Sequence, residues 1–158
     1  MVQRYPVTPA GHKRLRAELR QMIEVERPAA VLAIETARAH GDLSENAEYD
    51  YAKDKQGMLE AKIRDLEAKL SMAEVIDPTT MSGDKVMFGA TVTLEDLDTD
   101  EELTYKLLGG LEADIKQLII SIESPIGRAL LGKEVDDEVV INVPRGKRIV
   151  TVTGIEYK

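Results

Sequence analysis

The residues best placed to do chemistry are acidic side chains in a short polar segment of the first half of the chain. Residues 41–50 read Gly-Asp-Leu-Ser-Glu-Asn-Ala-Glu-Tyr-Asp and carry four carboxylates between Asp42 and Asp50. Asp42 and Glu45 have the spacing of a capping box, in which Asp42 caps a helix and Glu45 bonds back to its backbone. Carboxylate oxygens are also ligands that Mg²⁺ prefers, but two are too few to hold the ion alone. The segment is therefore either a helix cap or part of a metal site that another molecule completes.

Composition excludes several other kinds of site. The 158 residues include no cysteine, two histidines, one phenylalanine, five tyrosines and no tryptophan. A thiolate nucleophile, a disulfide and a cysteine zinc site are excluded, and few rings are left for stacking on bases. The net charge of -8 disfavours binding to nucleic acid by phosphate neutralisation alone. Neither an apolar leader nor an apolar run of membrane length occurs, so we expect a soluble, cytoplasmic protein without a membrane partner.

The acidic segment lies between two stretches with the apolar spacing of paired helices. The first begins at Thr8-Pro9, a plausible cap, and Gly41 is expected to end it. Asp42 is expected to begin the second, and Pro28 to kink the first. Spacings of three and four residues predict a coiled-coil seam. Its members are Leu15, Leu19, Met22, Glu26, Ala29, Ala33 and Ala37, facing Tyr49, Ala52, Gln56, Leu59, Ile63, Leu66, Leu70 and Ala73. An antiparallel hairpin about 45 Å long follows, with the carboxylates at its tip.

The second half of the chain has the alternation and turn residues of strands. Strands are expected at 85–94, 103–108, 118–122, 138–143 and 148–157, with a short helix at 125–131. The acidic run 95–102 lacks the glycine and spacing of a calcium loop and reads as a solvated hairpin loop. The predicted fold class is α+β, with a helical hairpin followed by a small antiparallel sheet domain. The expected domains are 1–76 for the hairpin, 77–84 for a linker at Pro78 and 85–158 for the globular part.

Four segments, in order along the chain, resemble the GreA family of bacterial transcript cleavage factors. They are His40–Tyr49, Gln56–Gly57, Phe88–Val92 and Ser124–Lys133. The resemblance covers essentially the whole chain and implies a hairpin that enters the secondary channel of RNA polymerase. It also implies a globular domain of FKBP-like fold that docks on the polymerase. Such a factor stimulates Mg²⁺-dependent cleavage of the nascent RNA 3′ segment in backtracked complexes, and the polymerase remains the enzyme.

The resemblance also assigns candidate site residues. Asp42 and Glu45 match the tip carboxylates that share Mg²⁺ only inside the polymerase complex, so no cofactor is bound stably by the protein itself. Arg38 and Lys53 flank the tip as candidate RNA contacts, although an ordinary solvated helix face explains them as well. The candidate docking residues are Ser124, Pro125 and Ile126. The protein is expected to be a monomer.

Three other functions stay open at this point. A relative that enters the same channel could inhibit the polymerase without promoting cleavage, although Asp42-Leu43-Ser44-Glu45-Asn46 looks like the cleavage-competent form of the tip. A prolyl isomerase would need an aromatic pocket, and only one phenylalanine and two tyrosines follow residue 84. A structural adaptor is permitted by composition alone. Asp136 departs from the glycine that many family members carry, a difference expected to alter the local turn or the surface charge and to leave the tip unchanged.

Overall fold

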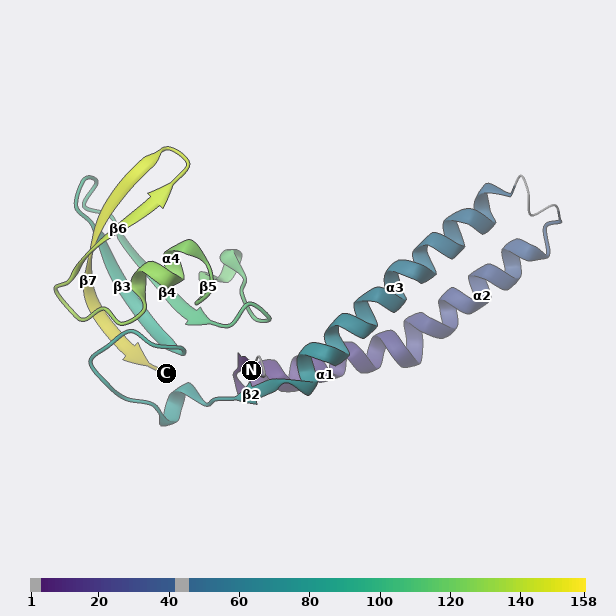
Figure 1. The fold of residues 1–158 in the computed structure, drawn as a ribbon, viewed down its shortest axis with the longest axis horizontal. Helices are drawn as coiled ribbons and strands as arrows, with labels where there is room; N and C mark the ends of the chain where they lie inside the picture. Colours follow the sequence, from purple (N-terminus) through teal and green to yellow (C-terminus); the bar gives the residue numbers. More distant parts are fainter. Residues whose placement is uncertain (1–3, 42–45) are drawn as a thin grey trace. The chain divides into compact units, whose positions relative to one another are not determined.

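The computed structural model describes residues 4–41 and 46–158, which form two compact units (Figure 1). One unit spans His12–Met72, and the other joins the residues up to Gly11 with Ala73–Lys158. This division differs from the boundaries expected at residues 76 and 85. The reason is a short parallel pairing of β1 (Tyr5–Val7) with β2 (Ala73–Val75), two strands that the sequence pattern did not reveal.

Within residues 9–41 and 46–71, the helical hairpin contains three α-helices and one π-helical turn. They are α1 (Pro9–Gln21), the π-helical turn η1 (Met22–Glu26), α2 (Arg27–Arg38) and α3 (Ala47–Ser71). The expected cap at Thr8 is confirmed, because its Oγ1 accepts a hydrogen bond from the N–H of Gly11 at 3.0 Å. Figure 1 shows α2 beside the N-terminal part of α3, and the rest of α3 continues beyond α2. The 25 residues of α3 give it a length of about 37 Å.

The π-helical turn provides the physical account of Pro28. In a regular helix the ring of Pro28 would clash with the carbonyl of Glu24, and its missing N–H would leave that carbonyl without a partner. Here the N–H of Arg27 donates to the carbonyl of Met22, five residues earlier, so the turn before the proline is wider than an α-turn. The expected irregularity at Pro28 is therefore a π-helical turn within a helical arm.

This turn also corrects the predicted seam of the first arm. One extra residue in a turn rotates everything after it by about 100° around the helix axis. The predicted positions Glu26, Ala29 and Ala33 are exposed, and the inward positions are instead one residue later. These are Arg27 and Ala30, which are half-buried, and Ile34, which is 8% exposed. Ala37, the last predicted position, is buried as expected, so the prediction is wrong only at Glu26, Ala29 and Ala33.

The seam of α3 follows the prediction from Tyr49 to Leu70. Ala52, Ile63 and Leu66 are buried, and the intervening seam positions are half-buried. Ala73 lies in β2 instead of the helix. Arg27 of the first arm donates two hydrogen bonds to the carboxylate of Glu60, Nε to Oε1 at 2.8 Å and a second nitrogen to Oε2 at 3.0 Å. This bond lowers the pKa of Glu60. Nothing in the structure explains Gly57.

Beyond β1 and β2, the described residues of the second unit contain a five-stranded sheet, two 3₁₀ turns and one short helix. Its elements are η3 (Pro78–Thr80), β3 (Ala90–Asp96), β4 (Glu102–Leu108), η4 (Ile115–Gln117), β5 (Ile119–Ser121), α4 (Pro125–Leu130), β6 (Glu138–Val143) and β7 (Gly146–Tyr157). The strand order is β5-β4-β3-β7-β6. Every neighbouring pair is antiparallel except β4 with β5, which is parallel. The predicted α+β class is confirmed, with a mixed instead of a purely antiparallel sheet.

The core of this unit lies between the sheet and α4. Alternate residues of β3, namely Ala90, Val92 and Leu94, are buried with Leu130 of α4. The predicted strand at 85–94 begins only at Ala90, because Gly89 has φ +90° and the N–H of Ala90 closes a turn onto the carbonyl of Met87. The other four predicted strands begin and end within two residues of the observed ones.

The first segment of the chain is fastened to the sheet unit through a buried carboxylate. Glu112 accepts the backbone N–H of Thr8 at 2.9 Å and the hydroxyl of Thr8 at 2.5 Å. Both residues are at least nine-tenths buried. A Cβ on Gly11 would lie 1.8 Å from the Glu112 carboxylate, so glycine is what permits this approach. The contact joins residues 104 apart in the sequence and was not predicted.

The acidic run 95–102 forms the expected hairpin between β3 and β4, but its loop is limited to residues 97–101, because Glu95 and Asp96 end β3 and Glu102 begins β4. Asp96 is only 1% exposed and accepts hydrogen bonds from the N–H groups of Asp98 and Thr99 and from Arg148. The bond from the N–H of Asp98 is the largest effect on the pKa of Asp96, and together with Arg148 it lowers that pKa despite burial. Asp96 therefore anchors the loop in its ionised form.

This anchor predicts a pH-dependent stability. Because the folded-state pKa of Asp96 lies below the unfolded value of about 3.9, its contribution is present above that pH and is lost as pH falls through the folded pKa. Asp96→Asn should lower Tm most at about pH 7, and the difference from wild type should shrink towards about pH 3. Thermal melts across this range measure it. A difference in Tm that does not change with pH would contradict the role of the charge.

Asp136 occupies a turn position that favours glycine. Its φ is +76°, and the N–H of Asp137 donates to the carbonyl of Glu134 at 3.1 Å across the turn. Asp136→Gly removes the steric cost of the left-handed conformation and should raise stability by about 0.5–1 kcal/mol. Thermal or denaturant unfolding measures the gain. Asp136→Ala is the control, because it removes the carboxylate but keeps a Cβ, and an equal gain from it would contradict the backbone explanation.

Candidate functional site at the hairpin tip

The tip carboxylates Asp42 and Glu45 lie outside the described residues, so the site is defined here by the residues that flank them. On the incoming side, α2 ends as the sequence predicts. The N–H of His40 donates to the carbonyl of Ala37, and the N–H of Gly41 donates to that of Arg38, both at 3.2 Å. Gly41 has φ +110°, a conformation that side chains with a Cβ rarely adopt. Glycine thus ends the first arm immediately before the carboxylates.

On the outgoing side, the N-cap of α3 is Asn46. Its Oδ1 accepts the N–H of Tyr49 at 3.0 Å, and the helix begins at Ala47. The prediction that Asp42 begins and caps the second helix is therefore wrong. Asp, Ser and Asn are all good caps and all occur between residues 42 and 46, so cap preference alone did not select among them. Asp42 is therefore not the N-cap of α3, and the side chains of Asp42 and Glu45 lie outside the described residues.

Asn46 also contacts the first arm. Its Nδ2 donates to the backbone carbonyl of Ala37 at 2.7 Å, and the side chain is half-buried. One side chain therefore bonds to the last turn of α2 and to the first turn of α3. Asn46 was not predicted to be a cap or a contact between the arms. In the sequence, only its position one residue before α3 indicated such a role.

Two further contacts join the same pair of helix ends. His40 Nδ1 lies 2.7 Å from Glu48 Oε2, with both side chains more than half exposed. The guanidinium of Arg38 lies 5.9 Å from the centre of the Tyr49 ring, a cation–π distance. Tyr49 is half-buried, in keeping with its predicted place in the seam. Exposed pairs of these kinds each contribute little stability.

The donor set suits a shared metal better than a resident one. Among residues 4–41 and 46–158, no three acidic or histidine side chains lie close enough to hold an ion. Asp42 and Glu45 offer hard carboxylate oxygens of the type that Mg²⁺ prefers, but two side chains leave most of its octahedral positions to other ligands. Glu48, the next carboxylate, lies against His40. The role of Asp42 and Glu45 as ligands to a Mg²⁺ ion shared with another molecule stays a prediction.

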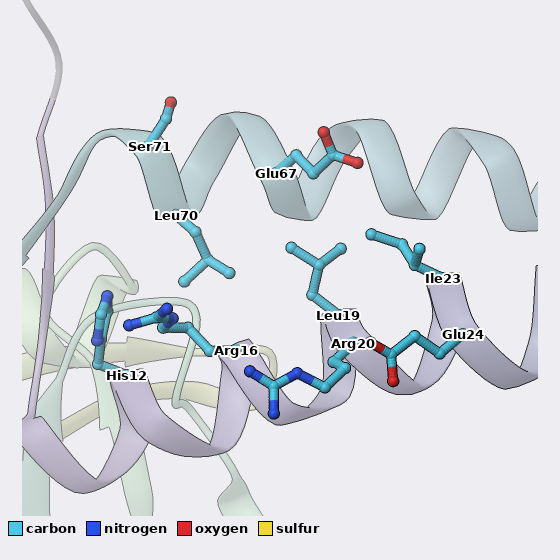
Figure 2. Close-up of a pocket in the computed structure, with 9 residues that line it drawn as sticks. All are labelled: His12, Arg16, Leu19, Arg20, Ile23, Glu24, Glu67, Leu70 and Ser71. Atoms are coloured by element: carbon cyan, nitrogen blue, oxygen red, sulfur yellow. The ribbon is translucent and has the colours of Figure 1, made fainter.

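The basic residues fall into two places on the hairpin. Arg38 ends α2, and Lys53 lies on α3 with an exposed side chain, so both candidate RNA contacts are near the tip. Farther along, Arg16 and Arg20 line a groove between α1 and α3 whose floor is apolar (Figure 2). Glu67 of α3 lies on the other side of this groove. Glu24 lies on the same side as Arg20, so both charge signs occur along the groove, as on an ordinary solvated coiled coil.

The candidate docking residues Ser124, Pro125 and Ile126 have clear structural roles. Ser124 caps α4, since its Oγ accepts the N–H of Gly127 at 3.1 Å. Pro125 takes the first helical position, where its missing N–H costs nothing, and Ile126 packs against the core. The motif thus builds the start of α4, and its docking role remains a prediction.

Two family models match this chain, one in each half. The family model described as "Transcription elongation factor, N-terminal" matches residues 5–75, and the model "Transcription elongation factor, GreA/GreB, C-term" matches residues 81–157. Together they cover both units. The chain belongs to the GreA/GreB family of transcription elongation factors. This membership confirms the resemblance drawn from the sequence motifs.

Individual relatives of the GreA/GreB family agree over nearly the full length. The chain is 53% identical over 157 residues to transcription elongation factor GreA of Syntrophotalea carbinolica, covering 99% of both chains. It is 54% identical over 156 residues to GreA of Sphingopyxis alaskensis, covering 99% of this chain and 98% of that one. Among solved structures, GreA factor homolog 1 of Thermus thermophilus is 30% identical with a TM-score of 0.46, covering 98% and 99% of the two chains.

Proposed function

We propose that this GreA/GreB family member enters the secondary channel of RNA polymerase and stimulates cleavage of the nascent RNA 3′ segment in backtracked complexes. The observation that carries the proposal is the identity of the tip. Asp42-Leu43-Ser44-Glu45-Asn46 keeps both carboxylates of the cleavage-competent form, and Asn46 rather than Asp42 caps α3. The two carboxylates are therefore not required to start the helix.

The chemistry at the tip follows from what carboxylates contribute. A pair of Mg²⁺ ions in a polymerase active centre activates water and stabilises the leaving oxygen of a phosphodiester. Asp42 and Glu45 would supply two anionic oxygen ligands toward one of those ions. Their negative charge also favours a cation at a position that the polymerase alone fills weakly. The protein itself binds no cofactor stably in this account.

The other candidate residues have supporting roles in the proposal. Arg38 and Lys53, on either side of the tip, would contact the phosphates of the extruded RNA. The sheet unit, with Ser124, Pro125 and Ile126 at the start of α4, would dock on the polymerase surface. The factor would act as a monomer in the cytoplasm, where the polymerase works. No helix in the described part of the chain combines the length and apolarity needed to cross a bilayer.

A cleavage factor of this kind should be inactive on its own. Two carboxylates cannot fix Mg²⁺ without further ligands, so we expect no hydrolysis of free RNA by the purified protein at any Mg²⁺ concentration. Incubation of labelled RNA with the protein, with and without EDTA, followed by gel analysis, measures this. Mg²⁺-dependent hydrolysis that persists through repeated purification and disappears in the Asp42→Asn variant would contradict action in trans.

A further inference from the structure

The side chain of Asn46 uses its two polar atoms in opposite directions. Oδ1 accepts the N–H of Tyr49 in the first turn of α3, and Nδ2 donates to the carbonyl of Ala37 in the last turn of α2. Ala37 is 0% exposed and sits in the seam between the arms. The two bonds, of 3.0 and 2.7 Å, therefore tie a buried point of one arm to the cap of the other.

The second of these bonds is not needed for capping. Serine and aspartate cap helices about as well as asparagine, but neither can supply both an acceptor and a donor here. Serine is too short to reach a second arm while it caps the first turn. Aspartate would present a second acceptor to the carbonyl of Ala37. Only the amide can satisfy the N–H of Tyr49 and the carbonyl of Ala37 together.

We propose that Asn46 is a positioning residue for the tip carboxylates. By joining the ends of α2 and α3, it fixes the two points between which residues 42–45 run. The exposed pairs His40 with Glu48 and Arg38 with Tyr49 join the same ends, but Asn46 makes the contact that is both half-buried and bonded to backbone on each side. This inference rests on the proposed function, because it concerns where Asp42 and Glu45 are held during cleavage.

Positioning matters because metal ligands act only within a narrow range of geometry. Misplacement of a ligand by about 1 Å can cost a catalysed step about 100-fold. Loss of the hydrogen bond from the Asn46 side-chain amide to the carbonyl of Ala37 would leave both carboxylates chemically intact. It would, however, let the ends of α2 and α3 separate. The expected loss is therefore in the rate of cleavage at saturation, and affinity for the polymerase should be unaffected.

The experiment compares Asn46→Ser with Asn46→Ala and wild type. Asn46→Ser keeps the cap and loses the donor, whereas Asn46→Ala loses both. Cleavage by backtracked complexes is measured across a range of factor concentrations, to separate the maximal rate from the half-saturating concentration. Both variants should lose about 10- to 100-fold in maximal rate with little change in half-saturation. Asn46→Ala should lower Tm more than Asn46→Ser does, because it removes the cap as well as the hydrogen bond to Ala37.

A measurement on the isolated protein tests the bond itself. Hydrogen exchange at the amide of His40, which donates to the same carbonyl of Ala37, should be faster in Asn46→Ser than in wild type. A full maximal rate in Asn46→Ser would overturn the positioning role and leave Asn46 as a cap. Wild-type protein that stimulates no cleavage would instead overturn the proposed function, so the two failures are distinguishable.

Discussion

Asp42→Asn is expected to abolish most cleavage stimulation while leaving folding and polymerase binding near normal. Asparagine has almost the shape of aspartate, but it is neutral and a weaker ligand for Mg²⁺. Loss of one carboxylate where a metal must be shared should reduce stimulation by at least about 100-fold. Glu45→Gln should have the same effect for the same reason. Cleavage of labelled RNA in backtracked complexes and competition for polymerase measure the two properties separately.

The alternative role for Asp42 was to cap α3, and the structure shows that Asn46 is that cap. If Asp42 were the cap of α3, Asp42→Ala would cost roughly 1 kcal/mol of stability and Asp42→Asn would be silent. Because Asn46 is the cap, both substitutions should change stability by at most a few tenths of a kcal/mol. Asp50→Asn, which removes an exposed charge from the first turn of α3, is the matched control and should keep cleavage near wild type. Full activity in Asp42→Asn would remove Asp42 from the mechanism.

Glu112→Ala is expected to cause the largest loss of stability from a single polar substitution. The Glu112 carboxylate accepts both the N–H and the hydroxyl of Thr8, and all of these groups are buried. Truncation leaves two donors without a partner and opens a space beside Gly11. Charge-assisted hydrogen bonds of this kind predict a loss of about 2–3 kcal/mol. Thermal melts and urea unfolding measure it.

A double-mutant cycle separates this contact from general effects of truncation. Thr8→Ala removes the hydroxyl and the cap of α1, and Thr8→Ala combined with Glu112→Ala should cost less than the sum of the two single variants. Glu112→Gln should fall between wild type and Glu112→Ala, because the N–H and the hydroxyl of Thr8 bond to different carboxylate oxygens and glutamine keeps only one oxygen. Additive single effects would mean that the residues do not act through their contact.

The architecture was predictable because its signals are local and repeated. Apolar spacing of three and four residues identified both arms, and Gly41 identified the end of the first. Alternation along β3 and the Ser124-Pro125 start of α4 located the sheet unit. Each of these patterns depends only on residues within the same turn or strand. A single sequence was therefore enough to predict these elements.

The features that were not predicted depend on side chains far apart in the sequence, or on backbone hydrogen bonds that leave no repeating pattern in it. The π-helical turn shifts the seam by one residue, and only Pro28 marked its neighbourhood. Burial of Asp96 requires Arg148, 52 residues away, and burial of Glu112 requires Thr8. At the tip, Asp42, Ser44 and Asn46 are all good capping residues, so residue preference alone did not identify Asn46 as the cap. The identity of the site followed from motifs, and its support by Asn46 became visible only in the structure.

The central claim is that this protein acts on RNA through the polymerase and not by itself. Its most direct test is a backtracked polymerase complex with 3′-labelled RNA, incubated with Mg²⁺ and either wild-type protein, Asp42→Asn or no addition. The account predicts rapid release of a short labelled 3′ fragment with wild type, and only the slow intrinsic rate in the other two reactions. Polymerase that binds wild-type protein yet cleaves no faster than without it would contradict the account.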